Sequence, residues 1–293
     1  MPSIRQLQTR IKSVQTTAKI TGAMQAVAAM RLKKYTQQSN AAHRYGEELR
    51  GVLRRIVSSL SDFDNSPLLR TRTEGKVLMV IVAPSRGFCG GLHRSVVLSA
   101  YQNLKDRGID PADPNQVEFI TIHKPAYRLM TKVGGKILAF FNGSFKELNP
   151  YKILPVSELI FRLWAEEQSR FKEVFIAFAE PTSSLKADLH TQKILPLSQG
   201  DLGDEVIDID KEHTFLENDM DKFLYEFLPQ WLEMNVHQAL VETMAAEEGA
   251  RMMAMNQASD NAKRLTDKLR LVYFRQRQAK ITQEISEIVG GSL

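Results

Sequence analysis

Residues 3–21 read SIRQLQTRIKSVQTTAKIT, and this stretch decides the fold class of the chain. Apolar and small residues recur in it at intervals of three and four: Ile4, Leu7, Ile11, Val14, Ala18 and Thr21. That spacing predicts the seam of a coiled coil, with Ser3 as the N-cap of the helix. The apolar face continues with some drift through Met24, Val27, Ala28, Leu32 and Tyr35. We therefore expect an N-terminal coiled-coil helix over residues 1–60.

Proline placement predicts a second long helix at the other end of the chain. None of the 11 prolines falls between residues 3 and 66 or after residue 229. Proline removes a helix hydrogen bond and clashes with the preceding turn, so these two segments can hold very long helices. In the second, helical spacing of apolar residues reaches Gly290: Leu240, Met244, Met255, Leu265, Leu269, Val272, Ile281, Ile285 and Ile288. We expect a C-terminal coiled-coil helix over residues 213–289.

Small residues indicate that the two helices pack closely. They recur every fourth position in two ridges: Ala246, Ala250, Ala254, Ala258 and Ala262, and Ala18, Gly22 and Ala26. Such ridges allow backbones to approach one another. The alternative is that alanine is simply the best helix former. We favour close packing.

The middle of the chain has the pattern of an α/β domain. β-branched and apolar runs predict strands at residues 77–83, 117–123, 136–141, 174–179 and 186–197. Helical stretches alternate with the first four, at residues 95–107, 126–133 and 156–171. This alternation predicts an α/β domain over residues 70–200. Residues 200–221 are acidic and lack apolar periodicity, which is typical of a solvated connection.

Composition and charge limit the class of protein. The chain has 293 residues, 43% of them hydrophobic, and no apolar stretch long enough to cross a bilayer. No secretory signal is visible, and the single cysteine, Cys89, fits a reducing compartment. The net charge of +5 is uneven: residues 1–60 carry +9, residues 61–231 carry −4 and the remainder is neutral. The basic arm predicts an acidic partner, which nucleic acid, an anionic lipid surface or an acidic protein would satisfy.

One loop has the position of a phosphate-binding site. Residues 84–91 (PSRGFCGG) follow the first predicted strand and precede a helix. The G-x-G-x-x-G and G-x-x-x-x-G-K-[ST] spacings are both missing, so we favour a structural turn over a nucleotide site. Cys89 has only His93 nearby, and we interpret it as a buried small hydrophobe rather than a nucleophile.

Other candidate sites are weaker still. The six histidines share no spacing suited to a metal, so we expect no metal site. In acidic pairs such as Glu166-Glu167, adjacent side chains on a helix point in different directions, so we expect no catalytic carboxylate pair and no catalytic residues. Lys33, Lys34 and the arginines that follow could neutralise phosphates, which makes a nucleic-acid binder a rival hypothesis. They lack interleaved aromatic residues apart from Tyr35 and Tyr45.

The two terminal segments carry a family resemblance. Residues 11–29 (IKSVQTTAKITGAMQAVAA) resemble the N-terminal signature of the gamma subunit of F-type ATP synthases. Residues 250–255 (ARMMAM) and 277–291 (RQAKITQEISEIVGG) are similar to the C-terminal signature, and RGFCGG at residues 86–91 is similar to the family's turn after the first strand. The resemblance covers the chain from end to end and is strongest in the two helices.

This resemblance implies a fold and a mechanical role. The fold is α/β with a long antiparallel coiled coil, in which a Rossmann-like layered domain lies between the N- and C-terminal helices. The coil is the rotor shaft inside a ring of three alpha and three beta subunits, and the foot joins the epsilon subunit and the membrane c-ring. One copy couples ion flow to ATP synthesis or hydrolysis without catalysing chemistry and without a cofactor. The family further implies a peripheral protein at the cytoplasmic face of a bacterial inner membrane or, alternatively, at the matrix face of the mitochondrial inner membrane.

The resemblance also implies contact residues. By position match, Met24 lies at the shaft contact with the beta subunit, where Arg10, Lys12 and Lys33 could add electrostatic attraction. Arg251, Arg277, Gln278, Thr282 and Glu284 lie in segments that contact the alpha and beta subunits. For Met24 the alternative is that it fills the coil seam. Because the last helix has the longer proline-free reach, we expect its end to protrude as a single helix with an apolar tip.

Overall fold

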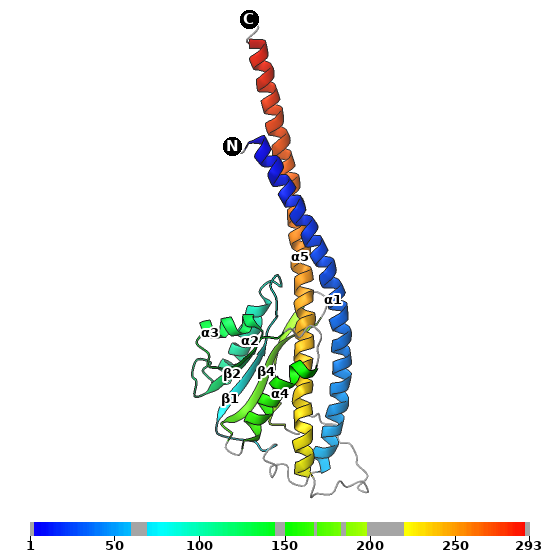
Figure 1. Cartoon of the computed structure of the whole chain (residues 1–293). Helices are drawn as coiled ribbons and strands as arrows, with labels where there is room; N and C mark the ends of the chain where they lie inside the picture. The colour runs from blue at the N-terminus through cyan, green and yellow to red at the C-terminus, as the bar shows by residue number, and fades with distance from the viewer. Residues whose placement is uncertain are drawn as a thin grey trace. The chain divides into compact units, whose positions relative to one another are not determined.

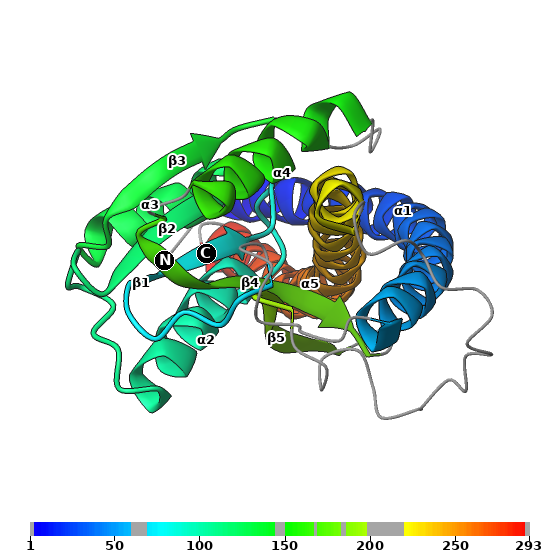
Figure 2. The same ribbon diagram turned by 90° about the horizontal axis from the view of Figure 1, so that it is seen from below.

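The computed structural model of the chain describes residues 3–59, 69–143, 150–166, 169–182, 186–197 and 220–290. They fall into two compact units, Met1–Met30 with Arg251–Leu293, and Arg31–Ala250. Two helices run through both units: α1 (Ile4–Ser59) and α5 (Met220–Gly290). Residues 60 and 213–219, expected in these helices, lie outside the described residues. Figure 1 labels the helices and strands except β3 and β5, which are labelled in Figure 2.

The start of α1 follows the sequence signal. The Gln6 backbone N–H donates to Ser3 Oγ at 3.2 Å, and the Ser3 N–H donates to Gln6 Oε1 at 2.8 Å. This reciprocal pair is a capping box, which satisfies two backbone donors that the first helical turn leaves without partners. Ser3 is therefore the N-cap, as predicted.

In the first unit, α1 and α5 pair as an antiparallel coiled coil. Gln8 Nε2 donates to the Tyr273 hydroxyl at 2.9 Å, and Ser259 Oγ donates to the Ala18 carbonyl at 3.4 Å. The partner's number falls as the residue number in α1 rises, so the helices run in opposite directions. The six predicted seam residues of α1, from Ile4 to Thr21, are all buried or half-buried.

The seam of α5 differs from a purely apolar pattern. It uses polar as well as apolar residues at alternating intervals of four and three: Met255, Ser259, Ala262, Thr266, Leu269 and Tyr273. Leu265 and Val272, which we placed among the periodic apolar residues, are each 41% exposed. In α1, Ala28 is buried while Val27 is 40% exposed. Apolar spacing alone therefore predicts the helices but misplaces part of their contact face.

The small residues do allow close approach, at one place. A β-carbon added to Gly22 would lie 3.9 Å from Ser259 Oγ. Ala18 and Gly22 thus face Ser259, one residue away from the predicted ridge position Ala258. Ala26 is exposed and takes no part in this contact.

The second unit is built on a five-stranded sheet in the order β3-β2-β1-β4-β5. Neighbours are parallel except for β5, which runs antiparallel to β4. The strands are β1 (Lys76–Val82), β2 (Val117–Ile122), β3 (Ile137–Phe141), β4 (Phe171–Pro181) and β5 (Ala187–Leu195). Each predicted strand is present, and the expected α/β fold class with its flanking terminal helices is confirmed.

Helices cover both faces of this sheet (Figure 2). α2 (Leu92–Asp106) and α3 (Lys124–Lys132) pack on one face, against Val77, Met79 and Ile81 of β1. α4 (Pro150–Ala165), α5 and α1 pack on the other, against Leu78, Val80 and Val82. This alternation explains why β1 is apolar at every position, as expected of a strand buried on both faces. The predicted helix 156–171 is wrong at its end, since Phe171 begins β4.

Candidate functional site

The loop after β1 lies where the strand order reverses, between β2 and β4, which is where α/β folds bind nucleotides. Here a side chain of α5 occupies that position. Ser85 N–H donates to Glu247 Oε2 at 2.6 Å, and Ser85 Oγ lies 3.2 Å from the same oxygen. Glu247 is 3% exposed. A bound phosphate would need a backbone N–H of this kind, and the Glu247 carboxylate already accepts it. The negative charge of Glu247 would also repel a phosphate. The geometry therefore favours a structural turn over a nucleotide site.

A neighbouring residue extends this contact between α5 and the strand ends. The Thr243 hydroxyl donates to the Val82 carbonyl at 3.3 Å and accepts from the Ala179 N–H at 3.3 Å. Thr243 thereby bridges the ends of β1 and β4. One helical turn later on α5, Glu247 holds the loop that follows β1. The sheet edge where a Rossmann-like fold would bind a nucleotide is therefore closed by the chain's own helix α5.

Cys89 fits its expected structural role. It is buried, and its Sγ lies 3.4 Å from the Arg86 carbonyl. Phe88 and Gly90 on either side have positive φ angles of 64° and 62°. Glycine adopts this backbone conformation without steric cost, whereas the bulky Phe88 adopts it rarely, so the loop turns sharply on both sides of Cys89.

The end of α5 presents four of the eight predicted contact residues on its surface. Arg277, Gln278, Thr282 and Glu284 are all exposed. Thr282 Oγ1 donates to the Gln278 carbonyl at 3.0 Å, and Glu284 Oε1 lies 3.5 Å from Lys280 Nζ. These are contacts within the helix, which leave the Gln278 amide and the Arg277 guanidinium facing solvent.

An apolar stripe runs along the same end of α5. Large side chains recur there at intervals of three, four and seven residues and are 44% to 72% exposed: Leu271, Phe274, Ile281, Ile285 and Ile288. Gln278 falls in the gap of this stripe. The seam that contacts α1 ends near Tyr273, and from residue 277 to residue 288 every side chain is exposed. In Figure 1 this end of α5 extends past the start of α1 as a single helix, as predicted.

The other predicted contact residues have mixed settings. Arg10 and Lys33 are exposed, and Met24 is half-buried beside the seam positions Thr21 and Ala28. Arg251 is 6% exposed, which leaves it little surface for a partner. The structure thus presents seven of the eight predicted residues, with Met24 shared between the seam and the surface.

Comparison with known proteins identifies the family. Residues 3–293 match the family model described as ATP synthase. The chain is 34% identical to the ATP synthase gamma chain of Geotalea daltonii, over 100% of this chain and 98% of that one. It is 32% identical to the gamma chain of Heliobacterium modesticaldum, over 100% and 99%.

This chain belongs to the ATP synthase gamma chain family. The resemblance seen in the sequence is thereby confirmed, as is the expectation of a central-stalk subunit.

Solved structures share the fold. The rotor of the Euglena gracilis mitochondrial ATP synthase aligns with a TM-score of 0.62 at 17% identity, covering 95% of this chain and 98% of that one. The central stalk and c-ring structure from Tetrahymena thermophila aligns with a TM-score of 0.61 at 18% identity, covering 82% and 99%. Among the described residues, none of the helices of this gamma chain combines the length and apolar character needed to cross a bilayer.

Two side-chain clusters in the second unit escaped the sequence analysis. The buried Glu118 carboxylate lies 3.0 to 3.1 Å from Lys76, Lys136 and Arg170. Burial alone would raise the pKa of Glu118, but the hydrogen bonds of Lys136 and Lys76 and the charge of Arg170 hold that pKa below its usual value. The sequence signal for this cluster was Glu118 itself, a charged residue inside the otherwise apolar run of β2.

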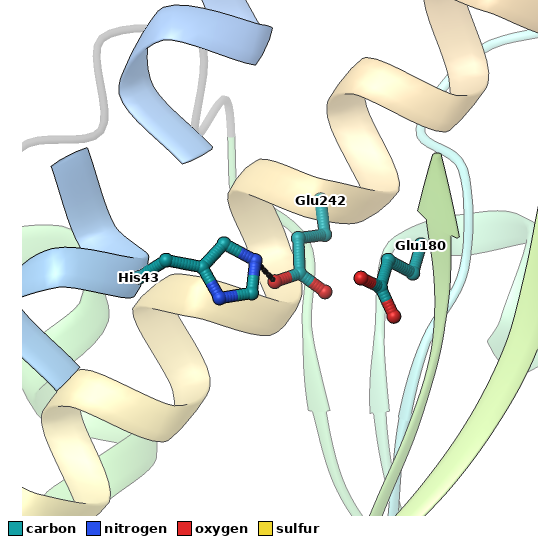
Figure 3. A group of neighbouring side chains, drawn as sticks. All are labelled: His43, Glu180 and Glu242. Atoms are coloured by element: carbon teal, nitrogen blue, oxygen red, sulfur yellow. Dashed lines mark ion pairs between the residues drawn. The ribbon is translucent and has the colours of Figure 1, made fainter. Parts of the chain in front are cut away.

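The second cluster joins His43 of α1, Glu180 of β4 and Glu242 of α5 (Figure 3). We had interpreted the histidines as unsuited to a metal because of their scattered positions. The structure brings these three residues together from distant parts of the sequence, and no local spacing could have shown it.

Proposed function

We propose that the paired terminal helices are the torque-carrying shaft of an F-type ATP synthase and that the alpha and beta subunits read the shaft's rotation. The chain is a gamma chain, and gamma chains are parts of the ATP synthase complex. The observation that carries the proposal is the single-helix end of α5. It is exposed from residue 277 to residue 288 and ends in an apolar stripe, which is the surface a close-fitting protein sleeve would cover.

An apolar stripe suits a rotating contact. Apolar contact is non-directional and scales with the area removed from water, so it changes little as one surface turns against another. Hydrogen bonds and ion pairs depend on geometry and must break when the shaft turns. Ile281, Ile285 and Ile288 therefore serve as a bearing surface. The polar residues beside them form contacts that depend on the angle of the shaft, and through these contacts the alpha and beta subunits sense its rotation.

The contact residues follow from this division. We propose that Arg277, Gln278, Thr282 and Glu284 contact the alpha and beta subunits near the tip. Arg10, Met24 and Lys33 would contact the beta subunit along α1. The exposed positive charges of Arg10 and Lys33 support attraction to acidic partner segments. Arg251 is buried, and its proposed part is to fix the shaft rather than to touch a partner.

The remaining assignments concern assembly. We propose one copy per complex, a foot that joins the epsilon subunit and the membrane c-ring, and a non-catalytic role without cofactor or nucleic acid. Glu247 supports the non-catalytic role, because its carboxylate closes the edge where a nucleotide would bind. The protein would be peripheral, at the cytoplasmic face of a bacterial inner membrane or, alternatively, at the matrix face in mitochondria.

The test replaces the polar contacts at the tip. Arg277→Ala with Gln278→Ala, in the complex reconstituted with alpha and beta subunits and the membrane sector, should slow ATP turnover or uncouple it from ion pumping. Arg275→Ala with Gln257→Ala is the matched control, since both residues are exposed on α5 outside residues 277–288 and neither is a predicted contact. Circular dichroism of the isolated chains should show unchanged helix content. Equal coupled activity in both doubles would contradict the proposed contacts.

A second experiment separates this function from its rivals. A tagged chain expressed in its native host should copurify with the alpha and beta subunits, two larger chains in equal amounts, and with ATPase activity. A nucleic-acid binder would instead copurify with nucleic acid, and its affinity would fall steeply as salt rises.

A further inference from the structure

The His43–Glu180–Glu242 cluster has the composition of a metal site. The ligand atoms of the three residues lie within 4.8 Å of one another. His43 Nε2 lies 2.7 Å from Glu242 Oε1. Figure 3 shows the Glu180 carboxylate, which projects from β4, facing Glu242 from the side opposite His43. All three residues belong to the same compact unit, Arg31–Ala250.

The ion pair with His43 does not satisfy the whole cluster. Glu242 is 1% exposed, and its second oxygen, Oε2, has no hydrogen-bond partner among the described residues. An unsatisfied buried carboxylate oxygen is costly, and here a second carboxylate faces it. Burial raises the pKa of Glu242 to about 7, and the charge of Glu180 adds to that rise. Glu242 Oε2 therefore faces a second carboxylate without a hydrogen-bond donor of its own among the described residues.

Neighbouring side chains hold the carboxylates in place. Gln238 Nε2 donates to Glu242 Oε1 at 2.9 Å, and His190 Nε2 lies 2.9 Å from Glu180 Oε2. The ring of His190 in turn stacks on Phe178, with ring centroids 5.8 Å apart. Outer partners of this kind orient metal ligands and raise affinity. His43 and Glu180 are partly exposed, so an ion can enter from solvent.

We propose that His43, Glu180 and Glu242 bind one divalent transition-metal ion, with Zn²⁺ the best match. Zn²⁺ binds imidazole and carboxylate at about 2.0–2.2 Å, so tetrahedral ligand atoms stand roughly 3.4 Å apart. The ligand atoms lie within 4.8 Å of one another, so the widest pair reaches that spacing by a contraction of at most about 1.4 Å. Mg²⁺ and Ca²⁺ prefer oxygen ligands alone, and the imidazole therefore selects against them. Water would complete the coordination.

The ion would join three distant elements of the fold. His43 belongs to α1, Glu180 to β4 and Glu242 to α5, so one metal ion would tie both terminal helices to the sheet. Coordination would replace the contact between His43 Nε2 and Glu242 Oε1, because that nitrogen must offer its lone pair to the metal. A ligand that binds only the folded chain raises its stability.

The test uses the full chain, stripped with EDTA and dialysed. Isothermal titration with ZnSO₄ should give one Zn²⁺ per chain, and thermal unfolding should shift upward with Zn²⁺ but not with MgCl₂. Co²⁺ should give the strong visible absorption of a four-coordinate site. His43→Gln and Glu180→Gln should each weaken Zn²⁺ binding about ten-fold or more. Glu48→Gln, which removes an exposed acid from α1, should leave it unchanged.

The test relies on His43→Gln and Glu180→Gln rather than on Glu242→Gln, because Glu242 is buried and its variant could fail to fold. His43 and Glu180 are partly exposed, so their variants keep the core. Binding that both variants leave intact would place the metal elsewhere and overturn the proposal. No Zn²⁺ binding up to about 100 μM, a concentration above the Kd of sensor-type calcium sites, would also overturn the proposal, because the cluster would then be an ion pair without a metal.

Discussion

A disulfide between the two shaft helices tests their predicted contact directly. The change is Gly22→Cys with Ser259→Cys, in a Cys89→Ser background. A β-carbon at position 22 lies 3.9 Å from Ser259 Oγ, the position that the new sulfur would take. The corresponding Cβ–Sγ distance across a disulfide is about 3 Å, so the helices need to approach by about 1 Å. We expect the pair to oxidise readily in air.

The magnitude follows from the length of chain that the bond closes. The two positions enclose a loop of roughly 240 residues, and the chain-entropy relation gives about 5 kcal/mol for such a loop. The bond should therefore raise the unfolding temperature of the paired helices sharply, and a reductant should reverse the change. Non-reducing gels measure the yield of crosslink, and circular dichroism at 222 nm with and without reductant measures the stability.

Ala23→Cys with Ser259→Cys is the matched control. Ala23 follows Gly22 in the chain but is exposed and points about 100° away around the helix. It should crosslink poorly. If the Ala23 pair crosslinked as fast as the Gly22 pair, the register of the coiled coil described here would be wrong.

Three further perturbations probe the closed sheet edge, a buried histidine and the tip. Glu247→Gln removes the charge that accepts from the Ser85 N–H, and urea unfolding should show a loss of about 1.5–3 kcal/mol; unchanged stability would mean that the loop is held by other contacts. Burial lowers the pKa of His123, whose Nδ1 lies 2.8 Å from the Ala83 carbonyl. The unfolded chain therefore binds a proton more readily, and the stability that neutral His123 contributes is complete above about pH 6.5 and is lost as the pH falls from there toward the folded pKa. His123→Asn, which tolerates the positive φ of 71°, should flatten that part of a stability profile measured from pH 5 to 8; a profile unaltered by the substitution would assign the pH dependence to other groups. Ile285→Asp should change the unfolding free energy by less than about 0.5 kcal/mol because the side chain is exposed, yet it should lower coupled ATP turnover in the assembled complex; full turnover would argue against an apolar bearing.

The sequence predicts the long elements well because each is governed by local periodicity. The spacing from Ile4 to Thr21 identifies both the helix and its contact face, and the β-branched runs identify each strand. The prediction fails where a seam position is polar. Ser259 and Thr266 lie in the seam while Leu265 is exposed, because a hydroxyl that bonds to a helix carbonyl can be buried without loss.

The contacts between distant elements could not be predicted in this way. Glu247 reaches Ser85 across 162 positions, and His43 meets Glu242 only because α1 and α5 are antiparallel. Nothing local marks either glutamate, since each also fits an ordinary exposed helix face. The contact residues at the tip were found through family resemblance. The apolar tip was predicted from the sequence, and the exposed side chains of α5 extend it back to Phe274 and Leu271 as one stripe.

Rotation of the chain within its complex tests the central claim most directly. The chain would be assembled with alpha and beta subunits fixed to a surface, with a probe attached through a single cysteine introduced on the foot in the Cys89→Ser background. We predict that ATP drives continuous rotation of the probe in one direction. A complex that hydrolyses ATP at full rate while the probe stays still would contradict the account.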